Sequence, residues 1–510
     1  MIEEGTNKII AKNATMLYFR MFVTMAISFY TSRIVLKALG VSDYGIYNVV
    51  GGVIVMISTL TGALGGATSR FLTFALGKKD MENLKTTFST AFYIHLTLAI
   101  LFVVVAESVG VWFVNTQLVI PEGRMGAANW VFQAAILSTA LGMTQTPYSA
   151  SITSHERMGA FAYIAIANAV FKLSIAFIVL ISAVDHLVLY SILLMILSIS
   201  FRLYYRYYCI KNFEECRLRL IFDKDLFKRM LSFSSWSMLG SISHSVKEQG
   251  VNVLINRFFG TLLNAAAGVS LQVQGLLYAF TANITTAFNP QIIKSYAVSD
   301  YKRVNELIGL GAKFTALVTI LTTIPLIFNM DFLMSLWLEE VPPGSVVICQ
   351  TLLFGNFLNS FNPMINRAII ASGQIKYVNI YFCFYYMILL LFTYIALKIT
   401  HYYVCPYLIG LFGCPLSTGI YMYLLKRVMP DFSIKRFLRT TYFPLVIIAL
   451  LSFVLAAFIT RIIDNKLLSF LIILVSCSLF VIIVVYYFVL DLKVKVQIKE
   501  YVKSMVKIAV

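Results

Sequence analysis

The sequence has few charged side chains: Asp, Glu, Lys and Arg together make up 13% of its 510 residues. Soluble globular proteins average about 25% charged residues, so this composition argues against a soluble chain. Hydrophobic residues make up 59% of the sequence and the mean hydropathy is +0.83. A chain this long and this apolar is predicted to be a polytopic membrane protein.

The sequence also lacks the motifs of several enzyme classes. It has no P-loop, and its seven cysteines form neither a CxxC pair nor a Cys/His metal spacing. We therefore predict no catalytic residue, no bound metal and no cofactor, and expect that the protein is not an enzyme. Acidic residues are scarce as well, 23 against 41 basic ones, but no nucleic-acid-binding motif accompanies the net charge of +18. Nucleic acid is therefore not an expected partner.

Long apolar segments recur along the chain, separated by short polar breaks. They predict an all-α fold with about fourteen transmembrane helices, because about 20 residues of helix cross a bilayer. The predicted spans are 14–37, 43–67, 87–112, 128–152, 159–182, 186–208, 232–258, 263–288, 309–330, 345–371, 377–398, 402–425, 441–461 and 467–490.

Lys and Arg are concentrated in alternate loops, and the six basic residues of segment 209–231 are the clearest case. The opposite loops hold few. The positive-inside rule therefore predicts that both termini are cytoplasmic. The opening MIEEGTNKIIAKN does not have the pattern of a removable signal peptide, so the first span is expected to remain.

An internal repeat predicts two lobes of six helices each. A shift of 220 residues places Gly40 on Gly260, Lys37 on Arg257 and Asp80 on Asp300, and a shift of 216–218 residues places Pro147 on Pro363 and Ser154 on Ser372. Six spans per repeat imply parallel repeats, and such transporters bind substrate between the halves. The predicted organisation is a lobe at 1–208, an amphipathic cytoplasmic linker at 209–231, a lobe at 232–427, an extra helix pair at 428–490 and a basic tail at 491–510.

The segment 232–260 combines the length of a membrane span with an unusual number of polar residues. At helical steps of three and four these form a single stripe: Ser234, Ser237, Ser241, His244, Ser245, Glu248, Asn252 and Asn256. A Lys or Glu at mid-bilayer costs about 2.5–3.5 kcal/mol on insertion scales, so this stripe is expected to face water or other helices.

Three stretches carry a resemblance to a known family: TSRIVLKALGVSDYGIYNVV, RFLTFALGKKDMENLKTTFSTAF, and FDKDLFKRMLSFSSWSMLG with the NRFFG that follows it. They resemble the Wzx-type O-antigen and capsule repeat-unit flippases, which are bacterial polysaccharide-biosynthesis proteins of the multidrug/oligosaccharidyl-lipid/polysaccharide (MOP, MATE-like) exporter superfamily. The resemblance implies a bacterial inner-membrane protein that moves a lipid-pyrophosphate-linked oligosaccharide from the cytoplasmic to the outer leaflet by alternating access.

Such a substrate requires a hydrated cationic cavity, because its pyrophosphate would otherwise lose hydration without compensation. The candidate binding residues are five cations that lie inside predicted spans: Arg20, Arg33, Lys172, Lys247 and Arg367. Arg20, Arg33 and Arg367 lie toward span ends, where they could instead extend to lipid headgroups. Glu248 and His244 are candidate coupling groups for H+ or Na+, or members of a polar network that only stabilises packing. Aromatic pairs such as Tyr385-Tyr386 are expected to form interfacial belts.

Two other functions stay open. A cation-coupled multidrug exporter of the same superfamily typically has an acidic residue in its first span, and this chain has Arg20 and Arg33 there instead. A membrane scaffold for envelope assembly would need no polar cavity. Besides its lipid-linked substrate and membrane lipids, the partners expected for a flippase are the polysaccharide polymerase and glycosyltransferases of the same pathway.

Overall fold

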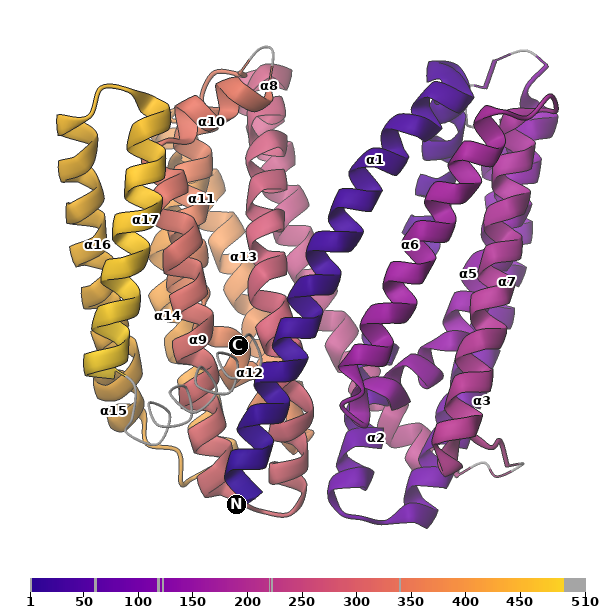
Figure 1. Ribbon diagram of the computed structural model, residues 1–510, viewed down its shortest axis with the longest axis horizontal. Coiled ribbons are helices and arrows are strands. Elements are labelled where there is room, and N and C mark those ends of the chain that lie inside the picture. Colours follow the sequence, from indigo (N-terminus) through magenta and orange to yellow (C-terminus); the bar gives the residue numbers. More distant parts are fainter. Residues whose placement is uncertain are drawn as a thin grey trace, which may run out of the picture. The chain divides into compact units, whose positions relative to one another are not determined.

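The computed structural model describes residues 2–58, 62–116, 120–121, 123–219, 221, 223–338 and 341–489. Within these ranges the chain is helical and contains no strand (Figure 1). It divides into two compact units: an N-terminal unit, Ile10–Met238, and a C-terminal unit, Leu239–Val510 together with Met1–Ile9. The prediction of an all-α polytopic membrane protein is confirmed.

The N-terminal unit is built around helix α5, which packs against α2, α3 and α7. Its core includes the fully buried side chains of Phe132 and Tyr148. The helices are α1 (Ile2–Ser58), α2 (Gly62–Gly77), α3 (Met81–Val105) with the π-helical turn η2 (Ala106–Gly110) and α4 (Val111–Thr116), α5 (Met125–Ser154), α6 (Met158–Leu180), α7 (His186–Asn212) and the short η3 (Glu214–Cys216). Helix α1 is kinked at Gly40, whose φ of 74° is a conformation that favours glycine.

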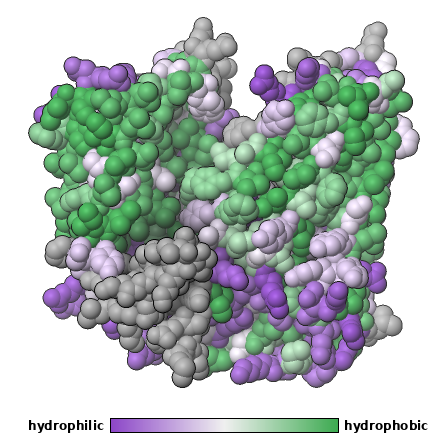
Figure 2. Space-filling view, in the orientation of Figure 1, coloured by the Kyte–Doolittle hydropathy of each residue, from purple (hydrophilic) through white to green (hydrophobic). Residues whose placement is uncertain are grey.

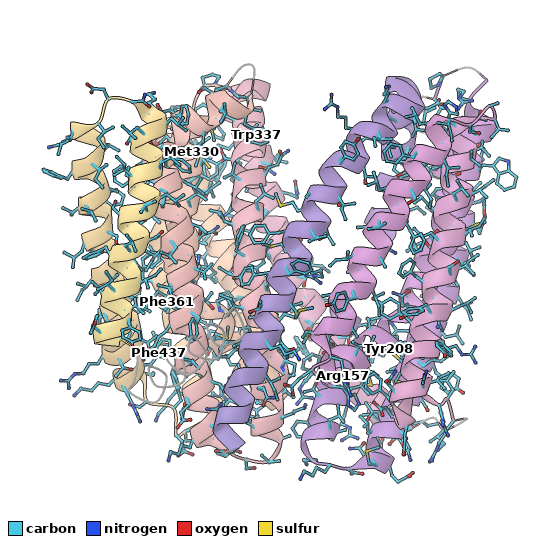
Figure 3. The ribbon with its side chains drawn as sticks, viewed as in Figure 1. Arg157, Tyr208, Met330, Trp337, Phe361 and Phe437 are labelled. Atoms are coloured by element: carbon cyan, nitrogen blue, oxygen red, sulfur yellow. The ribbon has the colours of Figure 1, made fainter. Side chains whose placement is uncertain are left out.

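In the C-terminal unit, the last two long helices, α16 and α17, pack against each other and against α9. The helices are α8 (Lys224–Ala297, whose first turns belong to the N-terminal unit), α9 (Tyr301–Phe328), α10 (Met330–Trp337), α11 (Ser345–Asn359), α12 (Asn362–Ser372), α13 (Ile375–Thr400), α14 (Cys405–Val428), α15 (Ile434–Phe437), η4 (Leu438–Tyr442), α16 (Phe443–Ile462), α17 (Lys466–Val484) and η5 (Val485–Val489). Met330 and Trp337 of α10 lie at the opposite end of this unit from Phe437 of α15 (Figure 3).

Two landmarks of the predicted repeat occupy equivalent structural positions. Asp80 and Asp300 each cap the helix that starts at the next residue, accepting backbone N–H bonds of 3.1 Å from Asn83 and 3.0 Å from Arg303. In the same way, α5 ends at Ser154 and α12 ends at Ser372. Asp80 and Asp300 therefore start their helices with the same cap chemistry.

Nine helices in the described ranges are long and apolar enough to cross a membrane, by length and composition. They correspond to nine of the fourteen predicted spans. The other five predicted spans, 43–67, 128–152, 232–258, 263–288 and 345–371, are also largely helical but are more polar or divided differently. In each unit a wide band of hydrophobic residues lies between hydrophilic ends (Figure 2), as expected for a membrane protein.

Two predicted spans are described by more than one helix. The described residues of span 43–67 belong to α1, up to Ser58, and to α2, which runs from Gly62 to Gly77, and residues 59–61 lie outside the described ranges. Span 345–371 divides into α11 and α12, with Pro363 in the first turn of α12. Proline has no N–H to donate and is favoured at the first helical positions, so it starts a new helix here rather than continuing the old one.

The amphipathic linker predicted at 209–231 contains the start of a long helix. Asp223 caps this helix, accepting N–H bonds of 2.9 Å from Asp225 and Leu226, and the helix continues as α8. Its apolar side packs on the N-terminal unit instead of lying in lipid, because Leu226 and Met230 are buried in a cluster with Leu64. The basic tail predicted at 491–510 lies outside the described residues.

Candidate functional site

Polar and aromatic side chains from four helices of the C-terminal unit form one group, which is partly buried and partly exposed. We name this group the aromatic–ionic cluster. Its members are His244, Lys247, Glu248 and Tyr278 of α8, Arg367 of α12, Tyr386 of α13 and Tyr421 of α14. Four of the seven predicted site residues therefore belong to one group, although they lie up to 123 positions apart in the sequence.

Glu248 is the acidic centre of the cluster. The Lys247 ammonium donates a hydrogen bond of 2.6 Å to its carboxylate. The Nε2 atom of His244 lies 3.9 Å from the same carboxylate, one helical turn away. The His244 ring also meets the ring of Tyr386 edge to face, with 5.3 Å between their centroids. Because Lys247 compensates Glu248 locally, the pair as a whole presents little net charge to a ligand.

Arg367 is the uncompensated cation of the cluster. Its half-buried guanidinium interacts electrostatically with the hydroxyl groups of Tyr278 and Tyr421. No carboxylate in the described part of the chain lies within ion-pair distance of it. A partly buried guanidinium without a counter-ion is costly, and an anionic ligand group that supplies hydrogen-bond acceptors would lower that cost.

The break between α11 and α12 helps to position Arg367. At this break Asn362 donates hydrogen bonds of 3.0 Å to Asn359 Oδ1 and 3.1 Å to Ser417 Oγ. Ser417 in turn donates to Asn359 Oδ1 at 3.0 Å. These bonds fix the start of α12 against α14, and Arg367 follows one and a half turns later on the same helix.

The aromatic members of the cluster were not predicted as site residues. The pair Tyr385-Tyr386 was expected in an interfacial belt, but it lies in the middle of α13, where Tyr385 is buried and Tyr386 contacts His244. Phe382, Tyr385 and Tyr386 follow one another at helical steps of three and four, and the Phe382 ring packs 4.3 Å from that of Tyr421. This spacing is the signal that could have identified an aromatic face.

The remaining three predicted cations lie in the N-terminal unit. The guanidinium of Arg20, on α1, lies 5.1 Å from the centroid of the Phe161 ring of α6 and interacts electrostatically with Tyr205. Arg33 on α1 and Lys172 on α6 are exposed, and neither has an ion-pair partner among the residues that the structure describes. The structure does not join these three into one site, and their roles in binding stay predictions.

An aromatic groove of about 780 Å³ lies between α6 and α7, and one of its lining residues, Phe171, directly precedes Lys172. It is lined by Ala160, Tyr163, Ile164, Ala167, Phe171, Ser200, Phe201, Tyr204 and Tyr208. Arg157 and Tyr208 lie close together at one end of this unit (Figure 3).

Sequence reasoning also missed Arg202 of α7, which lies over the Tyr148 ring at 4.7 Å and donates from Nε to Thr144 Oγ1 at 2.9 Å.

The predicted polar stripe of segment 232–260 is only partly a wet face. Ser241, His244 and Ser245 are exposed and Glu248 is half-buried, whereas Ser234 is buried with its hydroxyl donating to Met230 O at 2.9 Å. The side chain of Asn256 lies outside the described residues. The stripe therefore supplies its polar groups to the cluster mainly from its central two turns.

Ion pairs also fix the ends of helices outside the membrane-spanning segments. Arg124 binds both Asp43 and Asp185, with 3.0 Å from Nε to Asp43 Oδ1, and its hydrogen bond lowers the pKa of Asp185. Lys466 binds Asp331 and lowers the pKa of that carboxyl. In the described ranges no group of three or more His, Cys, Asp or Glu residues could hold a metal ion.

Comparison with known proteins identifies the fold. No family model matches the chain, and no curated protein is similar to it in sequence. A crystal structure of a MATE transporter in complex with MaD3S superposes with a TM-score of 0.73 and 12% identity, covering 84% of this chain and 97% of that chain.

Two further structures agree. A multidrug resistance MATE family transporter of the MOP superfamily, in an outward-facing conformation, gives a TM-score of 0.71 at 12% identity and covers 83% of this chain and 97% of its own. A MOP superfamily transporter from Pyrococcus furiosus, described as having a binding pocket of reverse polarity, gives 0.70 at 13% identity and covers 82% and 96%. The chain therefore has the fold of the MATE transporters of the MOP superfamily.

Proposed function

We propose that the protein is a transporter that moves a lipid-pyrophosphate-linked oligosaccharide from the cytoplasmic to the outer leaflet of the bacterial inner membrane by alternating access. The likeness in fold to MATE transporters supports a transport function. The concentration of basic residues in alternate loops supports cytoplasmic termini.

The observation that favours an anionic substrate most directly is the lack of a carboxylate partner for Arg367. Inside an apolar protein a guanidinium binds phosphate oxygens bidentately, and it does so more strongly than it binds neutral acceptors. The cluster as a whole carries one net positive charge, because its two cations, Lys247 and Arg367, outnumber its single carboxylate, Glu248. This charge suits a pyrophosphate and repels a lipophilic cation.

The aromatic side chains around Arg367 suit the sugar part of the same substrate. Tyr278 is exposed, and Tyr386 and Tyr421 are partly accessible beside it. A tyrosine ring offers an apolar face to the C–H groups of a sugar and a hydroxyl to its polar groups. In this proposal Glu248 and His244 form the coupling pair for H+ or Na+, with the ion changing the charge next to Lys247.

The second candidate is a cation-coupled multidrug exporter. Glu248 favours it, because a carboxylate within the predicted span 232–258 could bind a cationic drug, and one structure of the same fold belongs to a multidrug resistance transporter. The hydrogen bond of 2.6 Å from Lys247 opposes it, since this carboxylate is already compensated.

The test is transport of a fluorescent lipid-diphosphate-linked oligosaccharide by the purified full chain in liposomes, followed with a membrane-impermeant quencher. Loss of a charge-assisted hydrogen bond costs about 1.5–3 kcal/mol, so Arg367→Gln should weaken substrate binding roughly 10- to 150-fold. Arg367→Lys should keep part of the activity, because it retains the charge but not the planar fork.

The matched control is Arg461→Gln, which removes an exposed cation in the last turn of α16. It should leave transport unchanged. Two results together would instead favour the multidrug exporter. The Arg367→Gln variant would transport the lipid-linked sugar at the wild-type rate, and the Glu248→Gln variant would lose drug export.

A further inference from the structure

A second cationic site lies in the N-terminal unit, at the C-terminal end of α7. It is a surface pocket of about 360 Å³. Its lining residues are Leu203, Arg206, Tyr207, Ile210, Lys211 and Arg217. The first five follow one another at helical steps on one face of α7, and the sixth comes from the turn after the helix. Three of the six lining residues, Arg206, Lys211 and Arg217, are cationic, and α7 and the turn after it bring them together in one pocket.

The turn after α7 is firmly anchored, which fixes the position of Arg217. The rings of Phe213 and His155 are stacked with 4.2 Å between their centroids, and His155 Nε2 lies 2.6 Å from the carboxylate of the buried Glu215. Cys216 is fully buried in the adjacent hydrophobic cluster. Arg217 follows directly and is exposed, so this anchored turn presents its guanidinium beside the end of α7.

Nearby carboxylates are already paired with other cations. Glu82 lies 3.0 Å from Arg219 and 3.8 Å from Lys85, and Glu214 lies 3.4 Å from the same lysine. Glu215 is bound to His155.

The three cations of the pocket have no such partner. Over the described ranges, neither Arg206, Lys211 nor Arg217 has a carboxylate within ion-pair distance, and the Lys211 ammonium lies 5.9 Å from the Tyr207 ring centroid. The pocket therefore combines three positive charges with no negative charge. An anionic ligand is the complement that it lacks.

The position of the pocket along α7 indicates the kind of anion. Helix α7 is one of the candidate membrane spans, and at 27 residues it is about 40 Å long by its rise of 1.5 Å per residue, so its last turns extend beyond the hydrocarbon layer of about 30 Å. Hydrophilic residues gather at this end of the unit (Figure 2). Leu203 and Tyr207 are exposed beside the cations, as in a site that contacts both a headgroup and the start of an acyl chain.

We propose that this pocket binds the phosphate headgroup of an anionic glycerophospholipid of the surrounding membrane. Arg206, Lys211 and Arg217 bind the phosphate oxygens, and Leu203, Tyr207 and Ile210 contact the upper part of the acyl chains. Anionic lipid bound here links the end of α7 to the anchored turn. The proposal needs only the membrane location of α7 and does not depend on which substrate the protein transports.

Native mass spectrometry of the purified full chain with phosphatidylglycerol or phosphatidylcholine tests this site. The wild type should retain one phosphatidylglycerol at least tenfold more tightly than phosphatidylcholine. The triple variant Arg206→Gln, Lys211→Gln, Arg217→Gln should lose this preference. The charge-preserving variant Arg206→Lys, Lys211→Arg, Arg217→Lys should keep it, which separates loss of the site from misfolding.

The matched control removes the same number of positive charges from another basic segment, with Lys435→Gln, Arg436→Gln and Arg439→Gln in the exposed turns of α15 and η4. This variant should keep the preference for phosphatidylglycerol over phosphatidylcholine. Equal binding of the two lipids to the wild type, or equal loss in the control, would overturn the proposal. Displacement of phosphatidylglycerol by a polyprenyl diphosphate at lower concentration would also overturn it, because the pocket would then be a substrate site.

Discussion

The ion pair between Lys247 and Glu248 provides a direct test of the aromatic–ionic cluster. A double-mutant cycle compares the wild type with Lys247→Met, Glu248→Gln and the variant that carries both changes. Each single change removes one partner of a hydrogen bond of 2.6 Å, and the double change removes both. The single changes leave a partly buried charge without its partner, whereas the double change does not.

The expected magnitude follows from the burial of the pair. A hydrogen bond between charged groups contributes about 1.5–3 kcal/mol, and breaking a fully buried pair costs about 3–5 kcal/mol. The Lys247 and Glu248 side chains remain 22% and 31% exposed, so solvent screens part of this energy. We therefore expect a coupling energy of about 1–2 kcal/mol, with the double variant more stable than Lys247→Met alone.

The assay is unfolding of the purified protein in detergent, with the same cycle made on Lys466 and Asp331 as the control. That pair has side chains 61% and 53% exposed, and exposed pairs typically contribute about 0.2–1 kcal/mol. If the Lys247–Glu248 coupling does not exceed the control coupling, the pair is not held in a partly buried cluster, and the group that contains Arg367 is not assembled as described.

Two further predictions concern stability. In Gly250→Ala the new Cβ would lie 2.8 Å from Leu390 Cδ1, so the unfolding free energy should fall by about 1–3 kcal/mol. The control is Gly419→Ala, where no atom lies within 4 Å of the new Cβ, so the unfolding free energy should stay unchanged or rise by up to about 1 kcal/mol. Equal changes of the thermal midpoint in the two variants would refute the α8–α13 contact. The Arg124 hydrogen bond lowers the pKa of Asp185 from 3.8, so it stabilises the fold above about pH 4 and is lost as pH falls through the folded pKa. Thermal midpoints from pH 3 to 7 should therefore show Arg124→Gln less stable than wild type at pH 7, with a difference that narrows below pH 4, and a difference that widens would contradict this.

Much of the fold follows from local sequence signals. Apolar length predicted helices in all fourteen segments, and Asp80 and Asp300 start equivalent helices because an N-cap needs only a side chain and the next few N–H groups. The break between α11 and α12 was not predicted. It depends on hydrogen bonds between Asn362 and Ser417, which are 55 positions apart, so the sequence shows only Pro363.

The candidate site was predicted in part for a similar reason. Counting cations inside apolar spans identified Lys247 and Arg367, but whether a cation is compensated depends on tertiary contacts. The partner of Lys247 is its sequence neighbour, whereas the groups around Arg367 come from α8 and α14. Arg202 was missed, and the sequence does not show its contacts, because Tyr148 and Thr144 belong to another helix.

In our proposal, the uncompensated charge at Arg367 selects an anionic lipid-linked substrate. The decisive experiment measures, in the same liposomes containing the wild-type protein, the transport rates of a lipid-diphosphate-linked oligosaccharide and of a lipophilic cation. We expect saturable transport of the oligosaccharide, competed by a polyprenyl diphosphate, and no transport of the cation. If only the cation is transported, Arg367 does not select an anionic substrate.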